Sequence, residues 1–265
     1  SSANASRAGI YGARSSLFFV MVDCEAVQGQ VWPDVEFKGF KETVSSLRTE
    51  DLLICNDHIG CKPHKFCSSL FDWSRRPRFY WLEKIRTFGD GETWAEEEDH
   101  WWRVCTSCAR PSVRRWLDRG CSWPGEPEDR PHPTFMRYIV RKRETFKPTG
   151  KDSCTPQELA RWKAHGWPFP PYQFRTINLV LGRDGRPRLA SVRERTLLMH
   201  FPAKHLLAAT ASALYKSDPW GDYQVKASML GNTMDAWITA FLAGHAAAEW
   251  GYLSRPPTMS EIAAD

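Results

Sequence analysis

The stretch that most constrains this chain is residues 188–202, RLASVRERTLLMHFP. Ser191 stands three residues before Glu194, which is the spacing of a capping box, where each side chain binds the other residue's backbone N–H at the start of a helix. Pro202 marks the end of the predicted helix, and its apolar side comprises Leu197, Leu198 and Phe201. We therefore expect a helix with a defined start and a defined stop.

A second block, LGNTM at residues 230–234, precedes a long helical pattern that continues to Ala248. A Gly-Asn turn at the start of a helix can place backbone N–H groups against a ligand, because the first N–H groups of a helix have no partner inside it. Taken alone, each block also fits an ordinary structural helix, and only their combination and order point further.

Composition sets broad bounds on the protein. The chain has 265 residues, 42% of them hydrophobic and 25% charged, which suits one or two globular domains. A net charge of +5 and a pI near 8.8 permit a nucleic-acid partner without requiring one. We find no apolar run of the roughly 18 residues that a membrane helix needs and no signal peptide. Because Ser1 starts in the middle of a pattern, we expect a fragment or a truncated gene model.

Tryptophan is unusually frequent, with thirteen residues. Aromatic rings among basic residues can stack nucleic-acid bases, but packing in cores and interfaces is the interpretation we favour. The tryptophans that stand beside or near arginines are Trp73, Trp101, Trp102, Trp116 and Trp162.

Eight cysteines at irregular spacing do not indicate a disulfide framework, so a reducing compartment is expected. Cys105 and Cys108 form one C-x-x-C pair, to which Cys121 and either His100 or Cys154 could add zinc ligands. Because a second C-x-x-C pair is missing, no metal site is predicted.

The first third of the sequence alternates between helical and strand patterns. A helical pattern begins at Arg14, and a second helix over 47–59 ends at Gly60, a C-terminal glycine signal. Strands are predicted over 35–44, 65–69 and 78–82. This alternation favours an α/β layer with a largely parallel sheet.

From about Glu83 the pattern becomes irregular. Turn sequences such as Gly89-Asp90-Gly91 interrupt it, and residues 137–143 form a strand-like basic stretch. Residues 179–185 indicate a strand that enters a turn. We therefore expect three segments: 1–82, 83–187 and 188–265.

Together and in this order, the two C-terminal blocks resemble the last two blocks of the DNA (cytosine-5) methyltransferases, R-x-x-(S/T)-x-R-E-x-x-x-L-x-x-F-P and G-N-x-(V/M). That family carries three earlier blocks in a fixed order: R-(G/S)-x-L-F, E-N-V at a strand end, and Q-x-R-x-R. They correspond here to RSSLF at 14–18, ETV at 42–44 and SRRPR at 74–78. The resemblance spans nearly the whole chain, although the middle region matches only in position.

The sequence departs from the family at several points. Thr43 stands where the family has Asn, and Ser74 where it has Gln, which softens the hydrogen-bond support of the site. The Pro-Cys-Gln loop with the nucleophile and the Gly-rich cofactor loop should both precede Ser1, and none of the eight cysteines stands in that context. The resemblance thus implies the C-terminal portion of such an enzyme, which we expect to be inactive alone.

The implied fold is α/β. It comprises a partial S-adenosylmethionine-dependent methyltransferase (Rossmann-like) sheet, an inserted small, irregular, β-rich recognition domain, and a C-terminal helix that returns to the catalytic domain. Residues 1–82 would be the C-terminal half of the catalytic domain, 83–187 the target-recognition domain, and 188–265 the closing segment.

The mechanism of methyl transfer to cytosine determines which chemical groups the site must contain. Cytosine C5 is too weak a nucleophile to take a methyl group from a sulfonium, so a thiolate first adds to C6. An acid near N3 and donors near O2 then stabilise the charge on the ring. By resemblance, Glu42 would face N3 and the exocyclic amine of a flipped-out base, while Arg76 and Arg78 would bracket O2 and the adjacent phosphate. The plainer interpretations are a solvated carboxylate and a solvated basic turn.

The resemblance also implies a cofactor and a partner. S-adenosylmethionine would be the methyl donor, contacted by Leu17 and by the turn at Gly231, Asn232 and Thr233. DNA would be the partner, and the candidates for contact with it are Arg75, Arg137, Arg141, Lys142 and Arg143. Arg188 and Arg193 are expected to have a structural role at the junction between domains.

Two other functions stay open. One is a non-catalytic DNA-binding or regulatory module derived from such an enzyme, which the departures at Thr43 and Ser74 slightly favour. The other is a related enzyme that acts on tRNA, because it shares the same blocks. The resemblance implies a nuclear location in a eukaryote and a cytoplasmic one otherwise, and it predicts neither the target sequence nor the oligomeric state.

Overall fold

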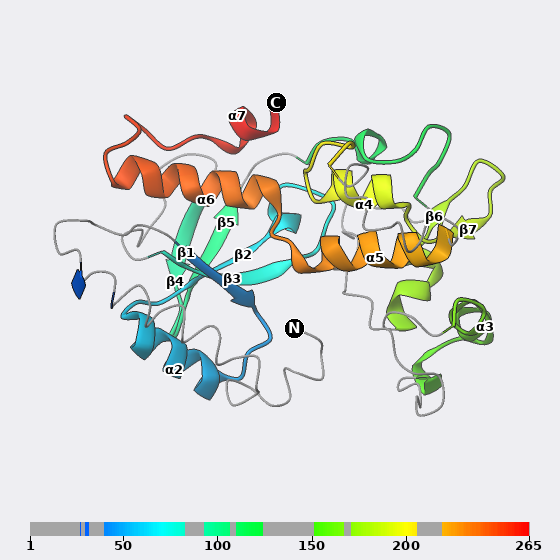
Figure 1. Cartoon of the computed structure of the whole chain (residues 1–265), viewed down its shortest axis with the longest axis horizontal. Helices are drawn as coiled ribbons and strands as arrows, with labels where there is room; N and C mark the ends of the chain where they lie inside the picture. The colour runs from blue at the N-terminus through cyan, green and yellow to red at the C-terminus, as the bar shows by residue number, and fades with distance from the viewer. Residues whose placement is uncertain are drawn as a thin grey trace. The chain divides into compact units, whose positions relative to one another are not determined.

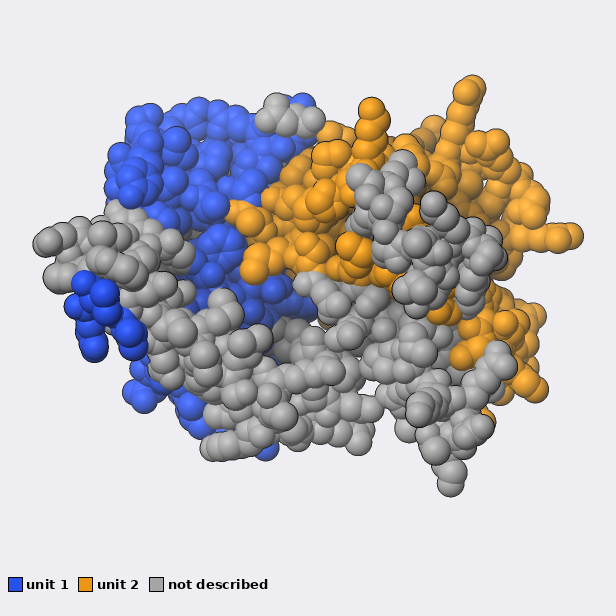
Figure 2. Space-filling view, in the orientation of Figure 1, with its two compact units in different colours: residues 1–70, 77–108, 240–265 blue, residues 71–76, 109–239 orange. Residues whose placement is uncertain are grey.

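The computed structural model of the chain describes residues 27, 30–31, 40–82, 93–106, 110–123, 151–166, 171–205 and 219–264. The chain divides into two compact units, which Figure 2 draws in different colours. Unit 1 comprises residues 1–70, 77–108 and 240–265, and unit 2 comprises residues 71–76 and 109–239. These units differ from the three predicted segments, because residues 93–106 share a unit with residues 40–70.

Unit 1 is built on a five-stranded mixed sheet with the strand order β1-β3-β2-β5-β4. Only the β2–β5 pair is parallel, whereas β1–β3, β2–β3 and β4–β5 are antiparallel. The α/β class is confirmed, but the prediction of a largely parallel sheet is wrong. The strands are β1 (Phe40–Val44), β2 (His64–Cys67), β3 (Pro77–Leu82), β4 (Thr93–Glu97) and β5 (Trp102–Thr106).

The lengths of the connections explain the antiparallel pairs. Residues 68–76 join β2 to β3, and residues 98–101 join β4 to β5. A crossover between parallel strands needs about a dozen residues or more, so these connections permit only antiparallel neighbours. The predicted domain boundary at residue 83 also separates β4 and β5 from the strands with which they form the sheet.

Helices of unit 1 cover the two faces of this sheet (Figure 1). Helix α2 (Thr49–Ile59) packs on one face, where its apolar side joins β3 in a buried cluster of Leu52, Cys55, Phe79 and Trp81. Helix α6 (Ala236–Glu249) lies on the other face, where Phe241 contacts Phe66 of β2 with ring centroids 5.6 Å apart. The core of unit 1 is therefore apolar on both sides of the sheet.

Several local predictions for unit 1 are confirmed. Helix α2 ends at Gly60, whose φ of 84° is left-handed and whose N–H donates to the carbonyl of Asn56 at 2.8 Å. Strands β2 and β3 lie where the strands over 65–69 and 78–82 are predicted. The predicted strand over 35–44 is described from Phe40 onward, and the helix predicted from Arg14 lies almost entirely outside the described residues.

Unit 2 contains helices α3 (Pro156–Ala164), α4 (Val192–Leu198) and α5 (Pro219–Asn232), with a short hairpin of β6 (Val180–Leu181) and β7 (Pro187–Arg188). The hairpin confirms the strand and turn predicted over 179–185. Elsewhere between residues 110 and 187, the described parts hold 3-10 turns and α3. Strands β4 and β5 also lie within the predicted domain over 83–187, so its described residues contain strands as well as turns and α3.

The 3-10 turns are short, and each spans three or four residues. Turn η2 (Ser68–Leu70) follows β2 in unit 1, and helix α7 (Met259–Ala264) is also in unit 1. The turns of unit 2 are η3 (Val113–Arg115), η5 (Lys151–Ser153), η6 (Pro171–Phe174) and η7 (Thr176–Asn178).

Unit 2 has two buried clusters. One joins α3, η6 and α5 through Trp162, Phe174 and Ala227. The other comprises Leu117, Val180 and Ala190. The packing role predicted for the tryptophans is confirmed for Trp73, Trp116 and Trp162, which are at most 7% exposed. In the part of the chain that the structure describes, no helix combines the length and the apolar character needed to span a membrane.

Candidate functional site

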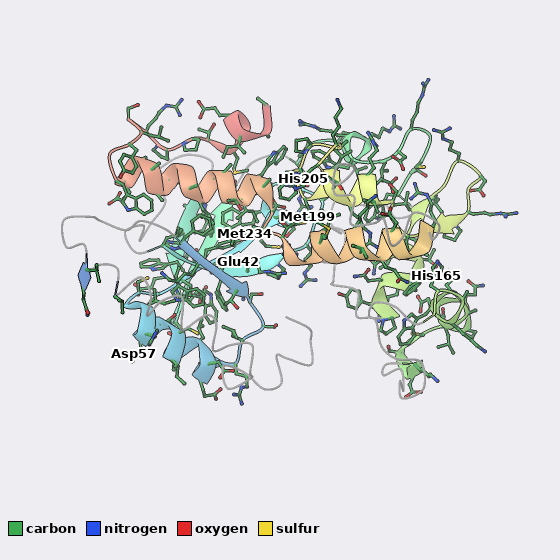
Figure 3. All side chains as sticks on the ribbon, in the orientation of Figure 1. Glu42, Asp57, His165, Met199, His205 and Met234 are labelled. Carbon is green, nitrogen blue, oxygen red and sulfur yellow. The ribbon has the colours of Figure 1, made fainter. Side chains whose placement is uncertain are left out.

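Glu42, which Figure 3 labels on β1, is paired with Arg78 of β3. Arg78 Nε lies 3.0 Å from Glu42 Oε1, and the two side chains are only 11% and 14% exposed. In the ladder Glu42 opposes Tyr80 and Arg78 opposes Val44, so the pair is diagonal on one face of the sheet. Phe66, which contacts α6, opposes Arg78 and shares that face. The plainer interpretation of Glu42 as a solvated carboxylate is therefore wrong.

The backbone also orients the guanidinium of this ion pair. Arg78 Nη1 donates to the carbonyl of Pro77 at 2.8 Å, and Arg78 Nε faces the Glu42 carboxylate. Glu42 stands at the end of its strand, as predicted, because β1 ends two residues later at Val44. A carboxyl group fixed in this way can accept a hydrogen bond from an amine or exchange a proton with a ring nitrogen.

Arg76 belongs to unit 2 and is 2% exposed. Its Nη2 donates to the carbonyl of Thr233, which directly follows α5. The structure therefore joins the SRRPR block to the LGNTM block by a buried contact, and a solvated turn is the wrong interpretation for Arg76. Arg75, by contrast, is exposed, so its side chain is accessible to a binding partner at the surface.

The Gly-Asn pair at 231–232 forms the end of α5 and does not open the next helix. The first N–H groups of α6 are accepted by Asp235 Oδ1, from Trp237 at 3.1 Å and Ile238 at 3.2 Å. These N–H groups are therefore capped by a side chain of the chain itself. The prediction that the Gly-Asn turn presents helix N–H groups to a ligand is wrong, because a turn signal here ends a helix.

Helix α4 begins with the predicted capping box. Ser191 N donates to Glu194 Oε2 at 2.7 Å, and Glu194 N donates to Ser191 Oγ at 3.1 Å. The carboxylate of Glu194 is fully buried and also accepts two bonds from Arg188, at 2.7 and 2.8 Å, and one from the backbone of Asp118. Burial alone would raise the pKa of Glu194, but the hydrogen bonds from Arg188, Asp118 and Ser191 outweigh it and lower that pKa.

Asp118 extends this network. It accepts from Ser191 Oγ at 3.0 Å and from Arg193 Nη1 at 2.8 Å. Arg188 and Arg193 therefore both have carboxylate partners inside unit 2, which is the structural kind of role expected of them.

Five residues of the predicted site lie outside the described residues: Leu17, Arg137, Arg141, Lys142 and Arg143. Within the described ranges, no group of three or more histidine, cysteine, aspartate or glutamate side chains is placed to hold a metal ion.

Sequence reasoning missed a buried trio in unit 2, Asp72, His200 and Asp235, whose side chains are fully buried. Asp235 has a signal that could have found it, because an aspartate just before an apolar helical run is a common helix start. Asp72 and His200 have no such signal, since they meet from segments far apart in the sequence.

Comparison with known proteins does not place the chain in a family: no protein-family model matches it, and a search of the curated proteins gives no match.

Proposed function

We propose that this chain is the C-terminal portion of a DNA (cytosine-5) methyltransferase, which transfers a methyl group from S-adenosylmethionine to C5 of cytosine in DNA. The observation that carries the proposal is the ion pair of Glu42 and Arg78, both of which are largely shielded from solvent. The two residues come from separate blocks of the resemblance, and the chemistry requires them to act on one base. The contact between Arg76 and Thr233, from two further positions of the resemblance, adds support.

The proposal gives each of these residues a task on a flipped-out cytosine. Glu42 would place a proton at N3, which withdraws electrons from the ring while a thiolate adds to C6. Arg78 would hold the Glu42 carboxyl group in the orientation that meets N3, and its guanidinium would lie near O2. Arg75, which is exposed, would contact the DNA phosphate.

S-adenosylmethionine, when bound, would supply the methyl group. Of the residues that the resemblance assigns to it, Gly231, Asn232 and Thr233 are described, and Arg76 already occupies the carbonyl of Thr233. These three do not by themselves form a cofactor site. The proposal therefore assigns no step of the reaction to a cofactor contact in the described residues.

A second candidate is a DNA-binding or regulatory module that resembles such an enzyme but performs no chemistry. The observations that favour it are Thr43 and Ser74, which stand where the family has Asn and Gln. In the enzyme, the thiolate would come from sequence outside these residues. A reaction that depends on the thiolate separates the two candidates.

Covalent trapping provides that reaction. The chain is joined to the coding sequence that precedes Ser1 and incubated with S-adenosylmethionine and duplex DNA that carries 5-fluorocytosine. The thiolate adds to C6 and the methyl group to C5, but fluorine cannot leave as a cation, so the thioether to DNA persists. We expect an adduct that survives denaturing electrophoresis.

Two matched variants test the role of Glu42. Glu42→Gln removes the acid, and we expect trapping to slow by roughly 100-fold or more, the usual contribution of a general acid. Glu50→Gln, an exposed residue in the first turn of α2, should trap at the wild-type rate. Binding of DNA without any adduct would support the module, and an adduct with an RNA hairpin but not with DNA would support the tRNA enzyme.

A further inference from the structure

His200 lies between two buried carboxylates in unit 2. Its Nε2 is 2.6 Å from Asp72 Oδ2, and its Nδ1 is 2.8 Å from Asp235 Oδ1. Each carboxylate also accepts other donors: Trp116 Nε1 reaches Asp72 Oδ1 at 2.8 Å, and the N–H of Trp237 reaches Asp235 Oδ1. Both ring nitrogens of His200 therefore face a carboxylate oxygen.

Two carboxylates that face the two ring nitrogens favour a proton on each nitrogen. A neutral imidazole has one N–H and would turn the lone pair of its other nitrogen toward a carboxylate. Burial alone lowers the pKa of His200, but the charge of Asp235 and hydrogen bonds to Asp235 and Asp72 outweigh it and raise the pKa to about 9. Burial also raises the pKa of Asp72, and the hydrogen bond and charge of His200 offset part of that rise.

Aromatic rings enclose the charged trio. Trp237 stacks on the imidazole with ring centroids 3.9 Å apart and an interplanar angle of 11°, and Trp116 meets it edge-on at 5.5 Å. Arg115 adds a positive charge nearby, because its guanidinium lies over the rings of both tryptophans, at 5.0 Å from Trp116 and 5.6 Å from Trp237. Rings that exclude water strengthen the attraction within the trio, because the local dielectric constant falls.

The backbone of His200 supports a specific role. Among the non-glycine residues that the structure describes, His200 alone has a positive φ, at 59°. A side chain in this left-handed region is disfavoured by contact between Cβ and the following carbonyl. Contacts with both carboxylates compensate for that strain, and they depend on the ring being held in this orientation.

The trio connects two segments that contain residues of the predicted site, 72–76 and 233–235. Asp72 stands four residues before Arg76, and Asp235 stands two residues after Thr233, the residue whose carbonyl Arg76 contacts. We propose that His200 is a positioning residue, whose imidazolium holds segment 72–76 against segment 233–235 and so sets Arg76 in place. The catalytic meaning of this placement rests on the proposed function, but the placement itself does not.

The first test measures the charge of His200 in the complete chain. Imidazole ¹⁵N signals of the ¹⁵N-histidine-labelled protein are followed from pH 6 to pH 10.5, with His200 assigned by correlation to its backbone. We expect imidazolium shifts for both nitrogens at pH 7 and a midpoint well above 6.5. Signals of a neutral ring at pH 7 would overturn the proposal, and this result needs no variant.

The second test measures the position of Arg76. The exchange of its guanidinium protons with water is compared at pH 6.5 in the wild type and in His200→Gln. We expect exchange at least tenfold faster in His200→Gln and unchanged in the matched control His58→Gln, an exposed histidine of α2. An unchanged rate in His200→Gln would overturn the positioning role.

A conservative variant keeps the test decisive if His200→Gln does not fold. Asp235→Asn retains an oxygen that can accept the Nδ1 proton and the helix N–H groups, but it removes the charge. We expect the His200 midpoint to fall by at least one pH unit and the exchange of Arg76 to accelerate. No change in either quantity would count against the proposal. None of these readouts needs DNA or S-adenosylmethionine, so they are independent of whether methyl transfer occurs.

Discussion

Glu194 offers the sharpest test of how this structure is stabilised. Its buried carboxylate closes the capping box of α4 and binds Arg188 through two oxygens. A second reciprocal capping box, Thr155 with Glu158, opens α3 and lies at the surface. The two glutamates therefore have the same local motif but differ in burial, and comparing their replacement isolates the effect of burial.

The expected cost follows from these contacts. Loss of a cap costs about 1 kcal/mol at either site. Glu194→Ala also leaves Arg188 without its main partner, which costs about 3–5 kcal/mol when a pair is fully buried. Because Arg188 is 34% exposed and keeps the carbonyl of Leu189, we take about 2 kcal/mol for this part. Glu194→Ala should thus lower the free energy of unfolding by about 3 kcal/mol, and Glu158→Ala by about 1 kcal/mol.

The assay is urea unfolding followed by circular dichroism, at pH 7 and again at pH 3.5. The pKa of Glu194 is depressed in the folded state, so its contribution is present above the unfolded value of 4.5 and is lost as the pH falls through the folded value. Because pH 3.5 lies below 4.5, the difference in unfolding free energy between wild type and Glu194→Ala should be smaller at pH 3.5 than at pH 7. Equal costs for Glu194→Ala and Glu158→Ala at pH 7 would refute the argument from burial.

Four further predictions concern stability. The free energy of unfolding should fall by about 2–3 kcal/mol between pH 7 and pH 10. The raised pKa of His200 makes a contribution to stability that is full below pH 6.5 and is lost as the pH rises through about 9. An equal fall in His200→Gln would contradict this prediction. Burial lowers the pKa of His245 to about 4, so acid from pH 6.5 to pH 4 should destabilise the wild type more than His245→Gln in thermal melts. Gly244→Ala should lower the free energy of unfolding by about 1–3 kcal/mol, since the new Cβ would lie 2.3 Å from Pro257 Cγ. A melting temperature equal to that of the wild type would show that Pro257 moves away without cost. Gly60→Ala has no atom within 4 Å of the new Cβ but a φ of 84°, so calorimetry should show only the backbone cost of about 1–2 kcal/mol.

Features set by residues three or four positions apart could be predicted from the sequence. The capping box of Ser191 and Glu194 is one such feature, and the glycine that ends α2 at Gly60 is another. Both depend on backbone groups within one helical turn, so the residues that decide them stand side by side in the sequence. The end of β1 at Val44 was predictable from a different local pattern, because the turn residues Ser45 and Ser46 directly follow the strand.

Features set by distant contacts could not be predicted. Strand direction depends on which strands become neighbours, and β5 pairs with β2 from a region that the sequence places in another domain. The Gly-Asn pair at 231–232 is a turn signal by composition, but the sequence does not decide whether such a signal begins or ends a helix, and here it ends α5. The contacts of His200 join three segments, and its left-handed backbone follows from those contacts, not from the residue type.

The measurement that tests the central claim most directly is methyl transfer itself. The chain joined to its preceding coding sequence is incubated with S-adenosylmethionine labelled in the methyl group and with unmodified duplex DNA, and the nucleosides are separated after digestion. We expect the label in 5-methyldeoxycytidine, with transfer retained in Glu50→Gln and lost in Glu42→Gln. A folded protein that binds the duplex but leaves deoxycytidine unlabelled would contradict the assignment of this chain to a cytosine methyltransferase.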